Sequence, residues 1–325
     1  MLVVEILGGL LLLFAGGEVL VRSALALARA AGVSPLLAGL TILGFGTSTP
    51  ELATSLQAAL IGSPGIAIGN VVGSNIANIL LILALAALIM PLACSRACWR
   101  RDCLTMMAAA LSLAAVCVSG RITPLHGVMF LLALMAYVFF AWRAERQAAA
   151  VLAAAASQPR ACDLSAAVRS GAADAIRPQW LRNAVLFAIG LGGVILGARL
   201  LVQGSVELAQ LAGLSETVIG LTIVAVGTSL PELATSLVAA WRRHPEIAFG
   251  NIVGSNIFNV FAIVGATAVV VPIEVPGEIM AFDIWIMLAA SLALLVFSAS
   301  SWRLSRIEGA VLIAGYAAYL GWLFA

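Results

Sequence analysis

The chain has 325 residues, of which 63% are hydrophobic and only 10% charged, and its formal net charge is +2. A soluble domain of this composition would leave far too much apolar surface in water, so the sequence excludes a soluble globular protein and indicates a polytopic membrane protein. Apolar runs of membrane-spanning length fall at residues 2–21, 35–60, 66–90, 103–119, 125–141, 183–203, 217–240, 247–271, 279–300 and 308–324.

The first run is interpreted as a retained helix rather than a signal peptide. It carries Glu5 where a signal peptide has basic residues, and Arg22 follows it like a stop signal. All 17 basic residues are arginines, and 15 of them fall in the connections on one side of the ten predicted spans. The positive-inside rule makes that side cytoplasmic and puts both termini outside.

The second half of the chain repeats the first. Residues 44–79 and 225–260 align without gaps at an offset of 181, and 23 of the 36 positions are identical. Each half holds five predicted spans, and because five is odd the second half enters the membrane from the opposite side. The sequence therefore predicts an all-α integral membrane protein with two inverted five-helix repeats, at residues 1–142 and 183–325, joined by a cytoplasmic linker at 143–182. This architecture is typical of secondary transporters.

The repeated segments, "GTSTPELATSL" from Gly46 and "GTSLPELATSL" from Gly227, carry polar groups into the membrane. Pro50 and Pro231 lack the N–H that a continuous helix needs, so each helix is expected to break and free backbone carbonyls. A glutamate in mid-membrane costs about 2.5–3.5 kcal/mol and is usually functional. A kinked packing helix with self-satisfied hydroxyls explains the serines and threonines alone, but not the two glutamates.

The polar groups of the two motifs are all hard oxygen donors. Neither motif contains His, Cys or Met, which favours Ca²⁺, Mg²⁺ or Na⁺ over transition metals. Two glutamates would neutralise one divalent cation, and the absence of arginine within the motifs argues against an anionic substrate. On residues alone the motifs predict a cation site built from both halves.

The segments "GTSTPE" with "GNVVGSNIANIL", and "GTSLPE" with "GNIVGSNIFNVF", resemble the two alpha-repeats of the sodium/calcium exchanger family, within the wider cation/Ca²⁺ exchanger superfamily. The resemblance covers the whole ten-helix layout and implies an antiporter that moves Ca²⁺ against several Na⁺, with net charge transfer, by alternating access. It also implies the site residues. These are Glu51 and Glu232 as central Ca²⁺ ligands, with Thr47, Ser48, Thr228, Ser229, Ser74, Asn78, Ser255 and Asn259 and the carbonyls of Gly44 and Ala225.

Some family members carry Asp where this chain has Asn78 or Asn259, so the site here has two formal negative charges. Sodium or proton coupling, and K⁺ co-transport, stay open at this point. The main alternative is an H⁺/Ca²⁺ antiporter that uses the same glutamates, and a more remote one is a cation channel. An intramembrane enzyme is disfavoured because no paired nucleophile and base, metal-binding His set or phosphate loop is present. An inert assembly protein is disfavoured by the duplicated buried glutamate.

Several further expectations follow. The protein needs no cofactor and no nucleic acid, a monomer is sufficient for transport, and a prokaryotic inner membrane is the expected location. Cys94, Cys98 and Cys103 are interpreted as small apolar filler with reduced thiols. Glu18 and Arg22 could pair at i, i+4, and Arg199 and Glu207 are interpreted as structural. Glu274, Glu278 and Asp283 either concentrate cations at an entrance or belong to a solvated loop.

Overall fold

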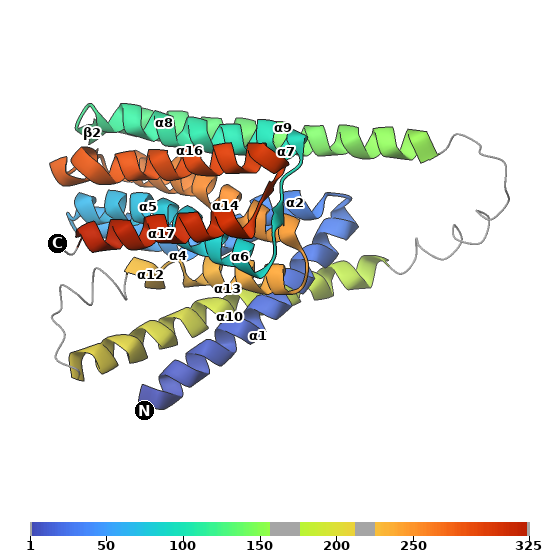
Figure 1. The fold of residues 1–325 in the computed structure, drawn as a ribbon, viewed down its shortest axis with the longest axis horizontal. Helices are drawn as coiled ribbons and strands as arrows, with labels where there is room; N and C mark the ends of the chain where they lie inside the picture. The colour runs from blue at the N-terminus through green and yellow to red at the C-terminus, as the bar shows by residue number, and fades with distance from the viewer. Residues whose placement is uncertain (1, 157–175, 212–224, 324–325) are drawn as a thin grey trace.

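The computed structural model describes residues 2–156, 176–211 and 225–323, and these form a bundle of long helices with two very short sheets (Figure 1). The first half contains α1 (Leu2–Ala31), α2 (Pro35–Leu37), α3 (Gly44–Thr47), α4 (Thr49–Leu60), α5 (Pro64–Ala77), α6 (Ala84–Ile89), α7 (Arg96–Cys98), α8 (Leu104–Cys117) and α9 (Pro124–Ala156). The second half contains α10 (Ile176–Leu211), α12 (Ala225–Gly227), α13 (Leu230–Trp241), α14 (Pro245–Phe258), α15 (Gly265–Val270), α16 (Ile284–Ser301) and α17 (Arg306–Leu323).

In the described residues, π-helical turns lie within or between these helices at η1 (Ala38–Leu43), η2 (Asn78–Leu83), η3 (Trp99–Cys103), η5 (Asn259–Val264) and η6 (Ile279–Asp283). The turns η2 and η5 both begin at an asparagine that the sequence predicts to be a ligand. Single π-helical turns are frequent at functional sites because they widen the helix and redirect side chains.

In the described residues, six helices are long and apolar enough to cross a membrane. They run over Val4–Ala31, Pro64–Ile89, Pro124–Gln147, Gln179–Gly204, Pro245–Val270 and Ile279–Ser301. The chain is therefore an all-helical, multi-pass membrane protein. The predicted spans at 35–60 and 217–240 are broken into shorter helices where they are described, and residues 217–224 lie outside the described part. The count of ten spans stays a prediction.

The predicted breaks at the two prolines are confirmed. Helix α3 ends and α4 begins around Ser48, whose φ and ψ are −84° and 5°. Helix α13 begins after Ser229, which has nearly the same angles, −90° and 7°. Because a proline at the second position of α4 and of α13 donates no hydrogen bond, the helix restarts there with a fresh N-terminus inside the bundle.

Two antiparallel strand pairs tie the halves together at opposite ends of α8. Strand β1 (Leu92–Ala93) pairs with β4 (Arg303–Leu304), and β2 (Arg121–Ile122) pairs with β3 (Ile273–Glu274). In each pair one strand comes from the first half and the other from the second. The inward side chains of all four strands are completely buried, so these short pairs anchor the ends of the bundle.

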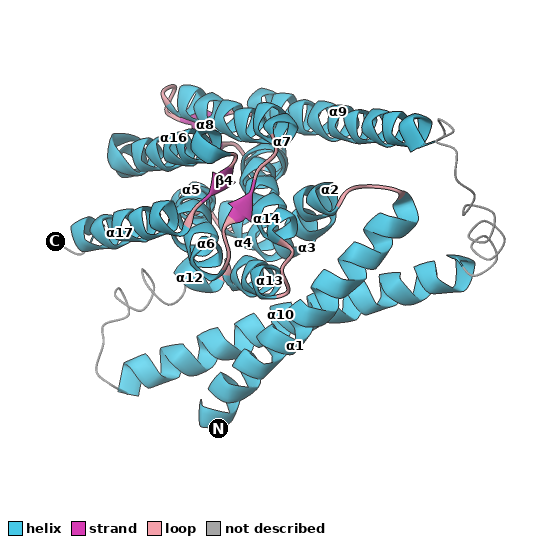
Figure 2. Cartoon of the chain, turned by 45° about the vertical axis from the view of Figure 1, so that its right-hand side comes forward, coloured by secondary structure: helices cyan, strands magenta, loops and turns pink. Residues whose placement is uncertain are grey.

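Helices α5 and α14 lie at the centre of the bundle, and α1 and α10 lie at its edge, where they cross one another (Figure 2). Close approach of α1 and α10 depends on glycine. A Cβ atom added at Gly9 would lie 2.7 Å from the Leu201 nitrogen, and one added at Gly190 would lie 2.7 Å from the Leu20 nitrogen. Small residues of this kind let helices in a membrane pack backbone to backbone.

Candidate cation site

Glu51 and Glu232 lie in the first turns of α4 and α13, on the two restarted helices. Each residue is only 1% exposed, and the two carboxyl groups are direct neighbours whose charges interact. The unpaired N–H groups and the positive dipole end of each helix favour a carboxylate at this position. The helix break therefore brings the two acidic side chains together in the middle of the protein and partly stabilises their charge.

The polar side chains around the glutamates reach across from one half to the other. Ser48 Oγ donates to Glu232 Oε1 at 2.8 Å, and Ser229 Oγ donates to Ser74 Oγ at 3.3 Å. The contact of Thr47 with Asn251 (3.5 Å) has its counterpart in that of Thr228 with Asn70 (3.3 Å), at matching positions of the repeat. The structure thus brings the predicted hydroxyl groups of both halves into one polar centre.

Two asparagines that the sequence analysis did not assign to the site orient two that it did. Asn78 Nδ2 donates to Asn256 Oδ1 at 3.2 Å, and Asn259 Nδ2 donates to Asn75 Oδ1 at 3.0 Å. Since the amide nitrogens are used in these bonds, the Oδ1 atoms of Asn78 and Asn259 are left for another partner. Asn75 and Asn256 are identical in the two repeats, and that identity is the signal that could have identified them.

Asn70 and Asn251 form a second pair of supporting asparagines. Asn251 Nδ2 donates to Ser236 Oγ at 3.0 Å, and Asn70 Nδ2 donates to Ser55 Oγ at 2.9 Å. Asn70 Nδ2 also lies 3.4 Å from the backbone carbonyl of Glu51. These bonds fix α5 against α4 and α14 against α13, so they hold the helices that carry the site in register.

Five buried oxygen atoms at the site have no hydrogen-bond partner among the residues that the structure describes. They are Glu51 Oε2, Glu232 Oε2, Asn78 Oδ1, Asn259 Oδ1 and Ser255 Oγ. Helix α4, which carries Glu51, packs against η5, which begins with Asn259, and α13 packs against η2 in the same way. Buried polar atoms are nearly always paired in folded proteins, so a group of acceptors left unpaired points to an absent partner of positive charge.

The remaining predicted ligands lie beside this group. The backbone of α3 packs closely against α14 at Gly44. A Cβ atom added there would lie 3.2 Å from the backbone nitrogen of Ser255, so Gly44 is a neighbour of Ser255. The Gly44 carbonyl accepts a hydrogen bond from the Ser48 N–H at 3.2 Å and keeps its second lone pair. Ala225 begins α12, two residues before Gly227, and its backbone leads into the second motif.

In the part of the chain that the structure describes, two cavities approach the site from one side. A cavity of about 450 Å³ is lined by Asn70, Ser74 and Thr228, and a second of about 490 Å³ shares Thr228 and adds Gln57 and Arg199. Equivalent residues of the repeat on the other side are closed off. Asn251, Thr235 and Thr47 are each 0% exposed, whereas their counterparts Asn70, Thr54 and Thr228 are half-buried. The cavities open on the side that the arginine distribution predicts to be outside.

The described cysteines and Glu18 lie outside the cation site. Cys94, Cys98, Cys103 and Cys117 are buried free thiols, and Cys162 lies outside the described residues. The predicted pair of Glu18 and Arg22 is confirmed, and Glu18 also pairs with Arg242 at 2.6 Å. The structure therefore links α1 to the end of α13, which the sequence spacing did not indicate.

Comparison with known proteins gives a consistent result. The family described as sodium/calcium exchanger protein matches residues 1–143 and 182–325. The chain is 35% identical over 339 residues to the sodium/calcium exchanger MaX1 of Methanosarcina acetivorans, covering 97% of this chain and 96% of that protein. It is 33% identical over 322 residues to the inner membrane protein YrbG of Escherichia coli, covering 97% and 94%.

The fold comparison agrees with the sequence comparison. A solved structure of the sodium-calcium exchanger NCX_Mj, soaked with Na⁺ and Ca²⁺, matches with a TM-score of 0.81 and 30% identity, covering 98% of this chain and 97% of that chain. A structure of the same exchanger soaked with zero Na⁺ and Ca²⁺ matches with a TM-score of 0.82. The chain belongs to the sodium/calcium exchanger protein family.

Proposed function

We propose that the protein is a secondary antiporter that exchanges Ca²⁺ for Na⁺ across the membrane. The observation that carries this proposal is the group of unpaired buried oxygens around the adjacent carboxyl groups of Glu51 and Glu232. Calcium takes about 6–8 oxygen ligands in flexible geometry, and carboxylates, amide carbonyls and hydroxyls are the types it uses. The relatives named as sodium/calcium exchangers support Ca²⁺ and Na⁺ as the transported ions.

The ligand set that we propose is the one predicted from the sequence. Glu51 and Glu232 neutralise the divalent charge, and Asn78, Asn259 and Ser255 supply neutral oxygens. Thr47, Ser48, Ser74, Thr228 and Ser229 complete the set with the carbonyls of Gly44 and Ala225. When Ca²⁺ leaves, the two carboxylates repel each other unless other cations replace it, and that repulsion couples the exit of one ion to the entry of others.

Alternating access between two inverted repeats accounts for transport by this site. The mirrored hydrogen bonds, the two strand pairs that each join one half to the other, and the two segments matched by the family all support repeats at residues 1–142 and 183–325. With ten spans and an arginine-rich side facing the cytoplasm, both termini lie outside. The one-sided cavities then correspond to an outward-facing state.

An H⁺/Ca²⁺ antiporter is the second candidate, because two neighbouring carboxyl groups could carry protons in place of sodium. Exchange of one Ca²⁺ for more than two monovalent cations would move net charge, and we propose that the exchange is electrogenic. The bacterial relative named as an inner membrane protein supports the inner membrane as the location. No cofactor is needed for this mechanism, and a monomer contains the whole site.

The test is ⁴⁵Ca²⁺ uptake into proteoliposomes loaded with Na⁺, at clamped pH. Uptake should require internal Na⁺, should be lost in Glu51→Gln and Glu232→Gln, and should persist in Glu246→Gln, which removes an exposed glutamate at the start of α14. Uptake that follows a pH gradient and ignores Na⁺ would identify a proton-coupled antiporter. Uptake without any countertransported ion would identify a channel.

Clamping the membrane potential with K⁺ and valinomycin tests the charge movement separately. Electrogenic exchange predicts that an inside-negative potential accelerates Na⁺-dependent Ca²⁺ efflux. An equal rate at all potentials would show that the exchange is electroneutral.

A further inference from the structure

Each half of the protein contains an aspartate–tyrosine contact among its described residues. Tyr137 Oη donates to Asp102 Oδ1 at 3.0 Å, and Tyr319 Oη donates to Asp283 Oδ1 at 2.8 Å. The two aspartates are 181 residues apart and so occupy equivalent positions of the repeat, and the two tyrosines, 182 apart, are one residue away from that register. Asp102 lies in η3, just before α8, whereas Asp283 follows β3, which pairs with the strand after α8. The contacts therefore lie at opposite ends of the bundle.

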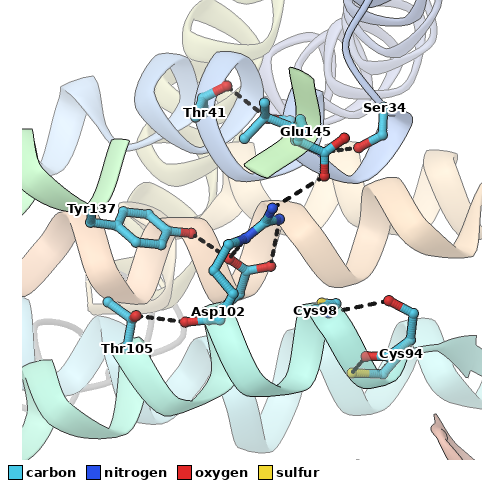
Figure 3. Close-up of polar contacts among 11 residues, drawn as sticks. Ser34, Thr41, Cys94, Cys98, Asp102, Thr105, Tyr137 and Glu145 are labelled. Carbon is cyan, nitrogen blue, oxygen red and sulfur yellow. Dashed lines mark hydrogen bonds and ion pairs between the residues drawn. The ribbon is translucent and has the colours of Figure 1, made fainter. Parts of the chain in front are cut away.

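Asp102, before α8, is buried, and an arginine compensates the charge of its carboxylate. Asp102 is 0% exposed and forms two bonds with the Arg101 guanidinium, from Nε at 2.7 Å and from Nη2 at 3.0 Å. Arg101 also reaches Glu145 at 3.2 Å, and Tyr137 approaches Asp102 from the other side (Figure 3). A bidentate arginine compensates the carboxylate charge and occupies its oxygens. This aspartate has no surface on which to receive a cation.

The aspartate before α16 has a different neighbour. The residue equivalent to Arg101 is Phe282, whose ring stacks on Trp322 with ring centroids 3.4 Å apart. Asp283 is half-buried and forms no ion pair with the residues that the structure describes. Its bond to Tyr319 fixes the carboxyl group but adds no positive charge, so the carboxylate keeps its attraction for cations.

Asp283 and Tyr319 line the cavity of about 450 Å³ that also reaches the cation site. Ser74 and Asn70 are part of the same wall. Ser74 accepts the hydrogen bond from Ser229, and Asn70 contacts the Glu51 carbonyl, so this wall is continuous with the ligands. A cation held near Asp283 is therefore already inside the cavity from which it enters the site.

We propose that Asp283 and Tyr319 form a staging site that holds a hydrated cation, Ca²⁺ in particular, in the open cavity before it reaches Glu51 and Glu232. This inference rests on the proposed transport of Ca²⁺. A carboxylate in a cleft with low-dielectric walls raises the local concentration of cations. Because Arg101 neutralises the equivalent aspartate at the other end, the staging site acts from one face of the membrane only.

Transport from each face separates this role from a structural one. Right-side-out and inverted vesicles from expressing cells, loaded with Na⁺, offer Ca²⁺ to the two faces in turn. In right-side-out vesicles at low ionic strength, Asp283→Asn should raise the KM for Ca²⁺ by about 3–10-fold with less than a twofold change in kcat. The effect should shrink in high salt because screening weakens the attraction, and it should be absent in inverted vesicles.

Two further variants complete this comparison. Glu278→Gln removes an exposed carboxylate five residues earlier that does not line the cavity, and it should leave the KM unchanged on both faces. Tyr319→Phe keeps the charge but removes the hydrogen bond, and it should raise the KM by about twofold on the same face. An unchanged KM in Asp283→Asn, or an equal rise on both faces, would overturn the proposal.

Terbium luminescence provides a readout that does not depend on transport. Tb³⁺ binds hard oxygen ligands as Ca²⁺ does, and nearby tyrosines sensitise its emission. In purified protein carrying Glu51→Gln and Glu232→Gln, Tb³⁺ emission that Ca²⁺ displaces should remain, and adding Asp283→Asn should abolish it while Glu278→Gln does not. Loss of all emission in the double glutamine variant would refute the staging site. Persistent emission in a wild-type protein that exchanges no Ca²⁺ would instead refute the proposed function.

Discussion

The hydroxyl of Ser48 donates a 2.8 Å hydrogen bond to the carboxylate of Glu232, and this bond joins the first motif of the chain to the acidic residue of the second. The equivalent serine of the other half, Ser229, bonds to Ser74 instead of to Glu51. The two halves therefore support their glutamates differently, although their sequences match.

Ser48→Ala should weaken the apparent affinity for Ca²⁺ by at least about tenfold, because the variant loses a bond to a charged acceptor worth about 1.5–3 kcal/mol and a proposed hydroxyl ligand. The KM for ⁴⁵Ca²⁺ uptake measures this change. Thr49→Ala is the matched control, since Thr49 is the next residue, is exposed and donates its hydroxyl to the Phe45 carbonyl of its own segment. Equal KM values for the two variants would show that Ser48 does not act on the site.

Asn256→Ala should also weaken Ca²⁺ binding, although Asn256 is not among the predicted ligands. The variant removes the acceptor that holds the Asn78 amide nitrogen, so Asn78 is free to turn its carbonyl away from the site. The expected loss in apparent affinity is about 3–10-fold. Asn256→Asp should retain most of the wild-type affinity, because an aspartate oxygen can still accept the bond from Asn78. Full affinity in Asn256→Ala would contradict the orienting role.

These two predictions show where sequence reasoning stops. The pattern of prolines, glutamates and hydroxyls predicts the broken helices and the polar centre, since both follow from local chemistry and from the repeat. The role of Asn256 depends on a contact with Asn78, 178 positions away, which only the packing of η2 against α14 creates. The sequence leaves open whether Asp283 lies at an entrance or in a solvated loop, because its position in a cavity depends on packing against Tyr319 and α17.

The third prediction concerns the packing of α1 on α10. Gly9→Ala should destabilise the protein by about 1–3 kcal/mol, because the new Cβ would lie 2.7 Å from backbone atoms of α10 and force the helices apart. Gly8→Ala, at the neighbouring position, meets no atom within 4 Å and should leave the stability unchanged or slightly higher. Thermal unfolding in detergent measures both variants, and equal Tm values would contradict the close packing.

The fourth prediction concerns the bond between Glu18 and Arg242, which links α1 to α13 on the side away from the cavities. Glu18→Gln removes a partly exposed ion pair worth about 0.2–1 kcal/mol, so it should shift the equilibrium between the outward- and inward-facing states by up to about fivefold toward the inward-facing state. Labelling of Gln57→Cys, in the wall of the second cavity, by an impermeant thiol reagent reports that population. Arg22→Gln should change the labelling rate little, since the ion pair of Arg22 with Glu18 lies within α1.

The fifth prediction concerns two equivalent turns. Gly62 has φ = 80°, and its counterpart Arg243 has φ = 60°, a left-handed conformation that costs a side chain about 1–2 kcal/mol. Gly62→Ala should lower the stability by about 1 kcal/mol, and Arg243→Gly should raise it by no more than that, because glycine also loses more entropy on folding. Gly321→Ala, which meets no atom within 4 Å, serves as the control in thermal unfolding. A lower Tm for Arg243→Gly would contradict the strain.

The two strand pairs also set an order of assembly. Strand β1 is made early, but its partner β4 lies just before the last helix, and β2 waits for β3 in the same way. Neither pair can close until most of the second half has left the ribosome and entered the membrane. The first half must therefore remain in the bilayer with strands β1 and β2 unpaired until the second half is inserted. Because the proposed ion site also needs both halves, it forms in the final steps of folding and does not nucleate the early steps.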